Sequence, residues 1–188
     1  LACCLLIALY ISKEISFDRY HAHADRVWRV TRTFLEQDGS VNLHLSAIAP
    51  PFGTLLPQHF PEIEALTRTL QNNGAVIRVD NNVLYTEDNA FFADENLFKV
   101  FTVPLQAGDV ATALAAPWQV VLSESTARRY FGDRNPLDQI LSLDRQSKFK
   151  VTGVFKDFPE ASHWHPSVLV SFATLRDSSV YGEQRLQT

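Results

Sequence analysis

Short stretches in which hydrophobic and polar residues alternate predict that β-hairpins dominate this chain. Three hairpins are expected where two such stretches flank a polar turn: residues 27–34 with 41–45, 75–79 with 83–87, and 140–143 with 149–155. The expected turns are residues 37–40, 80–82 and 144–147. Further extended segments are predicted at residues 63–70, 119–122 and 168–172. Gly153 is expected to form a bulge in the last hairpin.

Helical patterns are short and lie between the hairpins. Three helices are expected: over residues 52–60 after Pro50-Pro51, from a cap at Asp94 to Val100, and over residues 124–131. Ser123 is a good N-cap for the third helix, and Gly132 suits a left-handed cap at its end. Because strands and helices do not alternate as regular βαβα units, the sequence predicts an α+β fold with mixed or antiparallel sheets.

Composition indicates a folded domain and argues against several classes of function. The 188 residues are 46% hydrophobic and include 13 Phe and 3 Trp, enough for one domain or two small lobes. The formal charge is −4 and no long basic run occurs, which argues against nucleic-acid binding. The isolated glycines form neither a GxGxxG turn nor a GxxxxGK[ST] loop, so this chain does not hydrolyse ATP by itself.

Residues 1–11 are uncharged and apolar, and as a helix they would rise about 16 Å, roughly half of a bilayer's hydrocarbon core. They fit the end of a truncated transmembrane helix, a signal-peptide core or a buried helix. A signal peptide should begin with basic residues and end on a small-residue cleavage site, and both are missing. We therefore favour the truncated transmembrane helix, followed by a polar stalk at residues 12–26. The absence of methionine, even at position 1, predicts a fragment of a longer protein.

Candidate metal ligands are two H-x-H pairs with acidic residues nearby. They are His21 and His23 with Asp18 and Asp25, and His163 and His165 with Asp157 and Glu160. Imidazoles at this spacing share one side of a strand but diverge on a helix. Hydrogen bonding at the surface or at a hinge is therefore the better interpretation, and no metal or other cofactor is predicted.

The sequence also argues against an enzyme. No GxSxG motif surrounds the candidate serines Ser46, Ser123 and Ser125, and adjacent Cys3 and Cys4 lie in the apolar segment. The carboxylate pairs Glu62 with Glu64 and Asp94 with Glu95 lie in polar segments that would not raise a pKa. Aromatic residues that could line a binding surface are more simply explained as core: Phe91, Phe92, Trp118 and Trp164.

Four segments, in order along the chain, resemble one known family. They are EISFDRYHAHADRVWRV at 14–30, FFADENLFKVF at 91–101, VVLSESTARRYFGDRNP at 120–136 and VTGVFKDFPEASH at 151–163. Together they resemble the MacB-like periplasmic core domain, which occurs in permeases of the MacB/FtsX class of ABC transporters. The chain departs from the family at Pro136-Leu137-Asp138-Gln139, where relatives commonly read Pro-x-Gly-Lys.

The resemblance implies a two-lobed domain on the periplasmic side of the inner membrane, inserted after the first transmembrane helix of a permease. A Porter-like β-α-β lobe would include residues 27–89, a Sabre-like mixed lobe residues 90–168, and residues 169–188 would begin the return to the first lobe. The implied role is noncatalytic and couples cytoplasmic ATP hydrolysis to export or to periplasmic mechanotransmission. The implied partners are an ATP-binding subunit on a separate chain, a second permease copy, a periplasmic adaptor or cargo protein, and the membrane through the N-terminal helix.

On this interpretation the stalk would attach the membrane helix to the lobe. Side chains at Phe17, Tyr20 and Trp28 are expected to be buried there, at up to about 1.5–3 kcal/mol each. Asp25 or Arg26 is expected to add charge-assisted bonds, although a solvated turn at these two residues is an equally good interpretation. The alternative function is a ligand-sensing module of a membrane-bound receptor, which one further helix and a signalling segment would follow.

Overall fold

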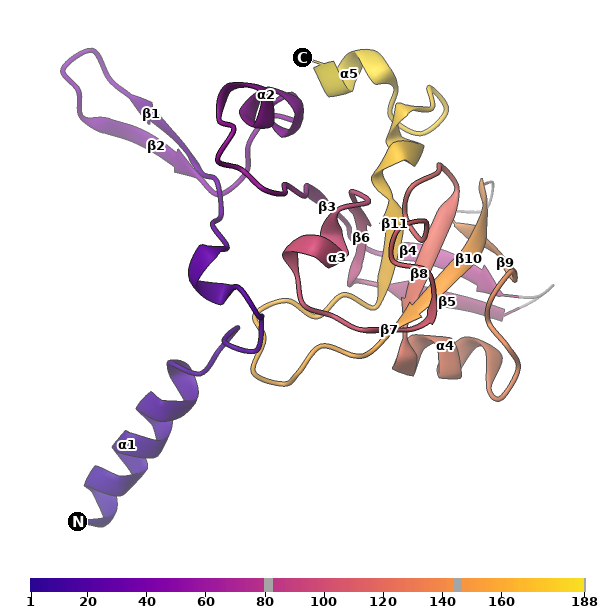
Figure 1. Ribbon diagram of the computed structural model, residues 1–188, viewed down its shortest axis with the longest axis horizontal. Coiled ribbons are helices and arrows are strands. Elements are labelled where there is room, and N and C mark those ends of the chain that lie inside the picture. The colour runs from indigo at the N-terminus through magenta and orange to yellow at the C-terminus, as the bar shows by residue number, and fades with distance from the viewer. Residues whose placement is uncertain (80–82, 144–146, 188) are drawn as a thin grey trace.

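The computed structural model describes residues 1–79, 83–143 and 147–187. The predicted turn at 80–82 and most of the turn predicted at 144–147 lie outside the described residues. Figure 1 shows an N-terminal helix, α1 (Ala2–Glu14), that projects from the rest of the chain. We call residues 27–66, which also project, the arm, and residues 69–176, which are built around a sheet, the body.

The body is built on one mixed β-sheet. Among the described residues it contains nine strands: β3 (Thr69–Asn72), β4 (Ala75–Val79), β5 (Val83–Glu87), β6 (Ala90–Ala93), β7 (Leu105–Gly108), β8 (Gln119–Ser123), β9 (Ile140–Leu143), β10 (Ser147–Phe155) and β11 (Val168–Ser171). Their order is β3-β6-β11-β8-β10-β9-β4-β5, and β7 pairs with β10. The β8–β10 and β6–β11 pairs are parallel, and the others are antiparallel. The predicted α+β class with mixed sheets is confirmed.

Side chains of the central strands point alternately to the two faces of this sheet, and a hydrophobic core lies on each face. Val120 of β8 belongs to one core and its neighbour Val121 to the other. In β10 the register shifts between Val151 and Gly153, and this bulge keeps Val151 and Val154 in the same core although their spacing is odd. A bulge is therefore present in the predicted strand, with Thr152, directly before Gly153, as the extra residue. The four aromatic residues considered above as a binding surface belong to or pack against these cores: Phe91, Phe92, Trp118 and Trp164.

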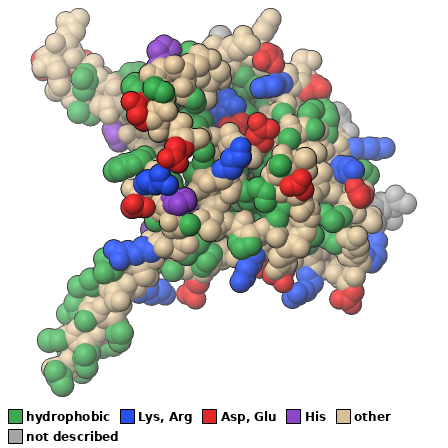
Figure 2. Space-filling model, viewed as in Figure 1, with side chains coloured by type: hydrophobic (Ala, Val, Ile, Leu, Met, Phe, Trp, Pro, Cys, Tyr) green, Lys and Arg blue, Asp and Glu red, His purple; other side chains and the backbone are tan. Residues whose placement is uncertain are grey.

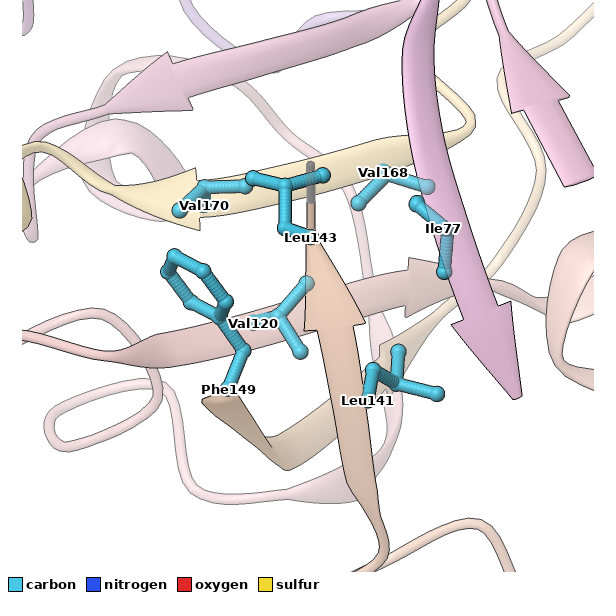
Figure 3. A pocket seen from close by; sticks show the side chains of 7 residues that line it. All are labelled: Ile77, Val120, Leu141, Leu143, Phe149, Val168 and Val170. Atoms are coloured by element: carbon cyan, nitrogen blue, oxygen red, sulfur yellow. The ribbon is translucent and has the colours of Figure 1, made fainter. Parts of the chain in front are cut away.

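A small pocket lies inside the first core, between strands β4, β8, β9, β10 and β11 (Figure 3). Its lining is entirely hydrocarbon: Ile77, Val120, Leu141, Leu143, Phe149, Val168 and Val170. Its volume of about 10 Å³ is at the lower limit for holding one water molecule. The pocket is therefore a packing void and offers no ligand a polar contact.

Helix α4 (Glu124–Phe131) covers the first core and begins as predicted. The Ser123 side chain accepts a hydrogen bond from the Thr126 N–H at 3.3 Å, which caps the helix. The helix buries three hydrophobic residues at helical spacing: Ala127, Tyr130 and Phe131. Gly132 ends the helix with φ 60° and ψ −125°. Its φ is positive, but ψ lies outside the left-handed helical region, so the predicted cap conformation is wrong in that respect.

Helix α3 (Leu97–Val100) is shorter than predicted and does not begin at Asp94. It starts after Asn96, which makes no side-chain cap. Asp94 instead accepts hydrogen bonds from Arg68, because it lies directly at the end of β6, opposite the start of β3. The expected apolar face is present, since Leu97 is buried in the second core and Phe101 packs against it.

The arm contains the first predicted hairpin in shortened form. Its strands are β1 (Arg32–Leu35) and β2 (Val41–Leu45), followed by helix α2 (Phe52–His59). The strand predicted from residue 27 begins only at Arg32, and the extended segment predicted from residue 63 becomes a strand only at Thr69. The remaining short elements are η1 (Ala24–Arg26), η2 (Phe172–Arg176) and α5 (Glu183–Gln187).

The predicted boundary between lobes, at residues 89 and 90, falls between β5 and β6. Both strands belong to the same sheet, so this boundary does not separate two sheets. The division of the chain into Porter-like and Sabre-like lobes stays a prediction.

Helix α1 has no buried residue, and its apolar side chains cover the surface of the projecting rod in Figure 2. Within the described ranges, none of the helices combines the length and the apolar character that crossing a bilayer requires.

Candidate functional site

The junction between the stalk and the body is the candidate functional site. After α1 the chain bends at Asp18, whose φ of 58° is a left-handed conformation that Asp adopts more readily than most residues. The Asp18 N–H donates to the Ala161 carbonyl oxygen at 2.9 Å. This bend brings residues 17–21 against two loops of the body, at residues 101–102 and 158–164.

The Asp18 carboxylate is the polar centre of the junction. It accepts hydrogen bonds from the Ser162 hydroxyl at 3.1 Å, from the His163 backbone N–H at 3.1 Å and from His163 Nδ1 at 2.7 Å. Burial alone would raise the pKa of Asp18, but the bonds from His163 and Ser162 outweigh it and lower that pKa. The carboxylate is therefore held in its ionised form, where it accepts stronger hydrogen bonds.

Aromatic rings surround this polar centre. The Phe17 ring lies 4.7 Å from the His163 ring, measured between centroids. The Tyr20 ring packs edge-on to Phe158 at 6.4 Å, and its hydroxyl lies 3.1 Å from Ser162 Oγ. Burial raises the pKa of Tyr20; the hydrogen bond to Ser162 opposes this rise, and the charge of Asp18 adds to it. The phenol is therefore neutral and able to donate a hydrogen bond.

His21 fixes the stalk to the loop at residues 101–102. Its side chain is buried, with the residue 8% exposed, and its ring centroid lies 5.2 Å from that of Phe101. The Thr102 N–H donates to His21 Nδ1 at 3.1 Å, and the Ala22 N–H donates to Thr102 Oγ1 at 2.9 Å. Because a backbone N–H can only donate, Nδ1 carries no proton and the ring is neutral. Burial lowers the pKa of His21, and the charge of Asp18 opposes this only in part.

The structure brings some of the predicted stalk residues to the junction and leaves others outside. Phe17 and Tyr20 are half-buried there. The expected burial of Trp28 is wrong: this residue is 84% exposed, because the chain has already left the body for the arm. Arg26 binds Glu64 of the arm at 2.9 Å. The Asp25 carboxylate is exposed and has no hydrogen-bond or ion-pair partner among the described residues.

Sequence reasoning missed Asp18, Ser162 and Thr102 as junction residues. The signal that came nearest was the pair of H-x-H strings, because His21 and His163 form hydrogen bonds, as the preferred interpretation of these strings expected. In the described part of the chain, no group of three or more His, Cys, Asp or Glu residues could hold a metal ion.

The candidate serines of α4 have structural contacts. Ser123 caps the helix, and the Ser125 hydroxyl donates to Asp157 Oδ1 at 3.1 Å. These bonds attach the start of α4 to the loop after β10, and they fit the capping interpretation made from the sequence.

The fold and this junction define an α+β domain on one mixed sheet, with a projecting apolar N-terminal helix, and comparison with known proteins gives its family. The family model for the MacB-like periplasmic core domain matches residues 1–187. The chain therefore belongs to this family, whose members are extracytoplasmic domains of permeases of the ABC-transporter type. Members of the family are generally noncatalytic. No curated protein sequence matches this chain.

Two solved structures share the fold. One is a domain assigned to a permease protein from Porphyromonas gingivalis, with 23% identity and a TM-score of 0.65, covering 78% of this chain and 64% of that one. The other is the periplasmic region of MacB from Actinobacillus actinomycetemcomitans, with 20% identity and a TM-score of 0.59, covering 81% of this chain and 68% of that one. The chain thus spans somewhat less than two thirds of the length of the first structure.

Proposed function

We propose that this domain receives movement from a membrane helix through the stalk and passes it to the body, as the noncatalytic periplasmic part of an ABC-transporter permease. The observation that carries the proposal is the junction around Asp18 and His21. A helix acts as a lever on a domain only if its outer end is fixed to that domain. The hydrogen bonds and ring contacts at residues 17–22 supply this fixed end.

The junction is suited to this role because it combines short polar contacts with packed rings. Asp18 bonds to residues on one loop, and His21 bonds to Thr102 on another, so the stalk is held at two points. A single contact would let the helix pivot about it, whereas two contacts to separate loops resist rotation. The second core lies directly behind them, since Tyr20 packs against it.

The partners in this proposal follow from its family. Permeases of the ABC-transporter type work with an ATPase, and we assign ATP hydrolysis to a cytoplasmic subunit on a separate chain. Helix α1, apolar and without buried residues, continues into the inner membrane and places the body on the periplasmic side. A second permease copy completes the transporter, and a periplasmic adaptor or cargo protein contacts the body.

The test uses the full-length permease with its ATP-binding subunit in lipid nanodiscs, so that no cargo needs to be known. Hydrogen–deuterium exchange of the body is measured with and without ATP. We expect ATP to change exchange in residues 69–176, and we expect the double variant Phe17→Ala with Tyr20→Ala to abolish this change while ATPase activity persists. The matched control is Trp28→Ala, an aromatic residue that lies near the stalk but is exposed.

Two results would contradict the proposal. If ATP leaves exchange in the body unchanged in the parent protein, the body does not respond to the nucleotide. If the double variant responds to ATP as the parent does, movement reaches the body by a route other than this junction.

A further inference from the structure

We propose that Arg68 is the positioning residue that fixes the arm to the body. Neither hydrophobic core contains a residue of the arm, although all of residues 27–66 are described. Large apolar side chains of the arm are instead exposed: Phe34, Leu35, Val41, Leu43, Phe52, Leu55 and Phe60. Apolar burial, which usually holds parts of a domain together, is therefore weak here, and a polar contact has to set the position of the arm.

Arg68 stands where the arm joins the edge strand of the sheet. Residue 69 begins β3, and the ladder of β3 with β6 pairs Thr69 with Ala93. Arg68 and Asp94 extend this ladder by one position, because the Asp94 N–H donates to the Arg68 carbonyl at 3.2 Å. The Arg68 N–H donates to Asp94 Oδ2 at 2.8 Å. The carboxylate takes the place of the backbone carbonyl that would accept this hydrogen bond if the ladder continued. The backbone of Arg68 is thus anchored to the body.

The guanidinium of Arg68 then joins the two parts. Its Nε and Nη2 donate to the two carboxylate oxygens of Asp94, each at 2.8 Å, which is the bidentate geometry that an Arg forms with a carboxylate. Its Nη1 donates at 3.2 Å to the carbonyl oxygen of Pro50, in the arm. The side chains of Arg68 and Asp94 are 23% and 18% exposed, so solvent screens this pair only in part.

Packing contacts of the Arg68 side chain also involve both the body and the arm. The guanidinium lies over the Phe172 ring, 4.1 Å from its centroid, on the side of the body. On the side of the arm, Gly53 of α2 approaches so closely that a Cβ atom there would stand 2.4 Å from Arg68 Cδ. The Arg68 side chain is therefore held between α2 of the arm and Phe172 of the body. Within the described residues, no hydrogen bond or ion pair joins residues 27–66 directly to residues 69–176.

A cleft beside Arg68 leaves room for the arm to change position. It has a volume of about 250 Å³, and residues of the arm and of the body line it, among them Gly53, Leu66, Glu95 and Arg176. The surfaces on its two sides are not packed against each other. Loss of the Arg68 contacts should therefore release the arm without opening either core.

The experiment measures the distance between arm and body by pulsed electron paramagnetic resonance in the full-length protein without nucleotide. Spin labels are attached through Gln37→Cys in the arm and Asp133→Cys in the body, after Cys3→Ser, Cys4→Ser and replacement of any cysteine elsewhere in the full-length protein. The test variants are Arg68→Lys, which keeps the charge but cannot form the bidentate pair, and Gly53→Ala. The matched control, Arg128→Lys, alters an exposed Arg that pairs with Glu124 inside α4.

We expect the main distance to shift and its distribution to broaden in both test variants and to stay unchanged in the control. Thermal unfolding of the body should not change. If Arg68→Lys also destabilises the body, its distance change does not test the contact by itself. Gly53→Ala then provides the test, because it changes only the arm's side of the contact. An unchanged distance distribution in Gly53→Ala would overturn the proposal. The measurement needs neither ATP nor transport, so its outcome is independent of the proposed coupling function.

Discussion

The substitution Asp18→Asn tests whether the junction is one cooperative unit. Asn keeps the shape of the side chain and tolerates the left-handed backbone at this position, so the change removes mainly the negative charge. One carbonyl oxygen remains to accept a hydrogen bond, but the charge-assisted bond from His163 is lost. Such a bond is worth about 1.5–3 kcal/mol in a buried site. Because the Asp18 side chain is 43% exposed, we expect a loss of about 1 kcal/mol.

Amide hydrogen exchange measures this loss at the residues that the junction protects. A destabilisation of about 1 kcal/mol corresponds to roughly fivefold faster exchange through local opening. The increase should appear at the Ala22 and Thr102 amides, which form the hydrogen bonds between the stalk and the loop at residues 101–102 and do not bond to Asp18 itself. The control is Asp38→Asn, which removes the same charge from a carboxylate that accepts the Ser40 N–H in the hairpin turn. Unchanged exchange at Ala22 and Thr102 in Asp18→Asn would refute the idea of a cooperative junction.

Three further predictions concern pH, capping and close packing. Because the folded pKa of His21 lies below its ordinary value of 6.5, the undocked stalk binds more protons than the docked one as the pH falls below 6.5, and the junction weakens. Protection of the stalk amides, measured relative to their intrinsic exchange rates at each pH, should therefore fall on acidification in the parent protein but not in His21→Gln. Ser123→Ala should lower the free energy of unfolding by about 1 kcal/mol in a urea titration, since α4 loses its cap; no loss would mean that the cap is unimportant. Gly108→Ala should cost more than about 2 kcal/mol, because φ is 93° and its Cβ would stand 2.3 Å from a carbonyl oxygen of β10. Gly74→Ala, with φ 68° but open space, isolates the backbone strain, and equal losses in the two variants would contradict the proposed clash.

Along the chain the junction precedes the arm, and the Arg68 contact follows it. The stalk meets the arm through the Arg26–Glu64 pair, which is exposed and therefore weak. The arm meets the body through Arg68, which donates to Pro50 of the arm and whose pair with Asp94 is better shielded from solvent. Movement of the stalk should therefore reach the body mainly through Asp18 and His21, and the arm should follow the body.

Local patterns account for the elements that the sequence predicted correctly. The hairpins at β4–β5 and β9–β10 follow from alternation on either side of a polar turn, and α4 follows from the Ser123 cap and its apolar spacing. These signals are contained within short, continuous stretches of the chain. Strands β6 and β7 were missed because each has only four residues, and pairing with distant strands makes them extended.

What the sequence by itself determined is therefore the α+β class, the main hairpins and the family to which the chain belongs. Only the tertiary structure decided which residues form the junction, since Asp18 and His163 are separated by 145 positions. It also decided that Trp28 is exposed and that Asp94 bonds to Arg68 instead of capping a helix. The physical reason is that a side chain's burial and its hydrogen-bond partners depend on which distant loops pack beside it, whereas turns, caps and alternation depend on neighbours along the chain.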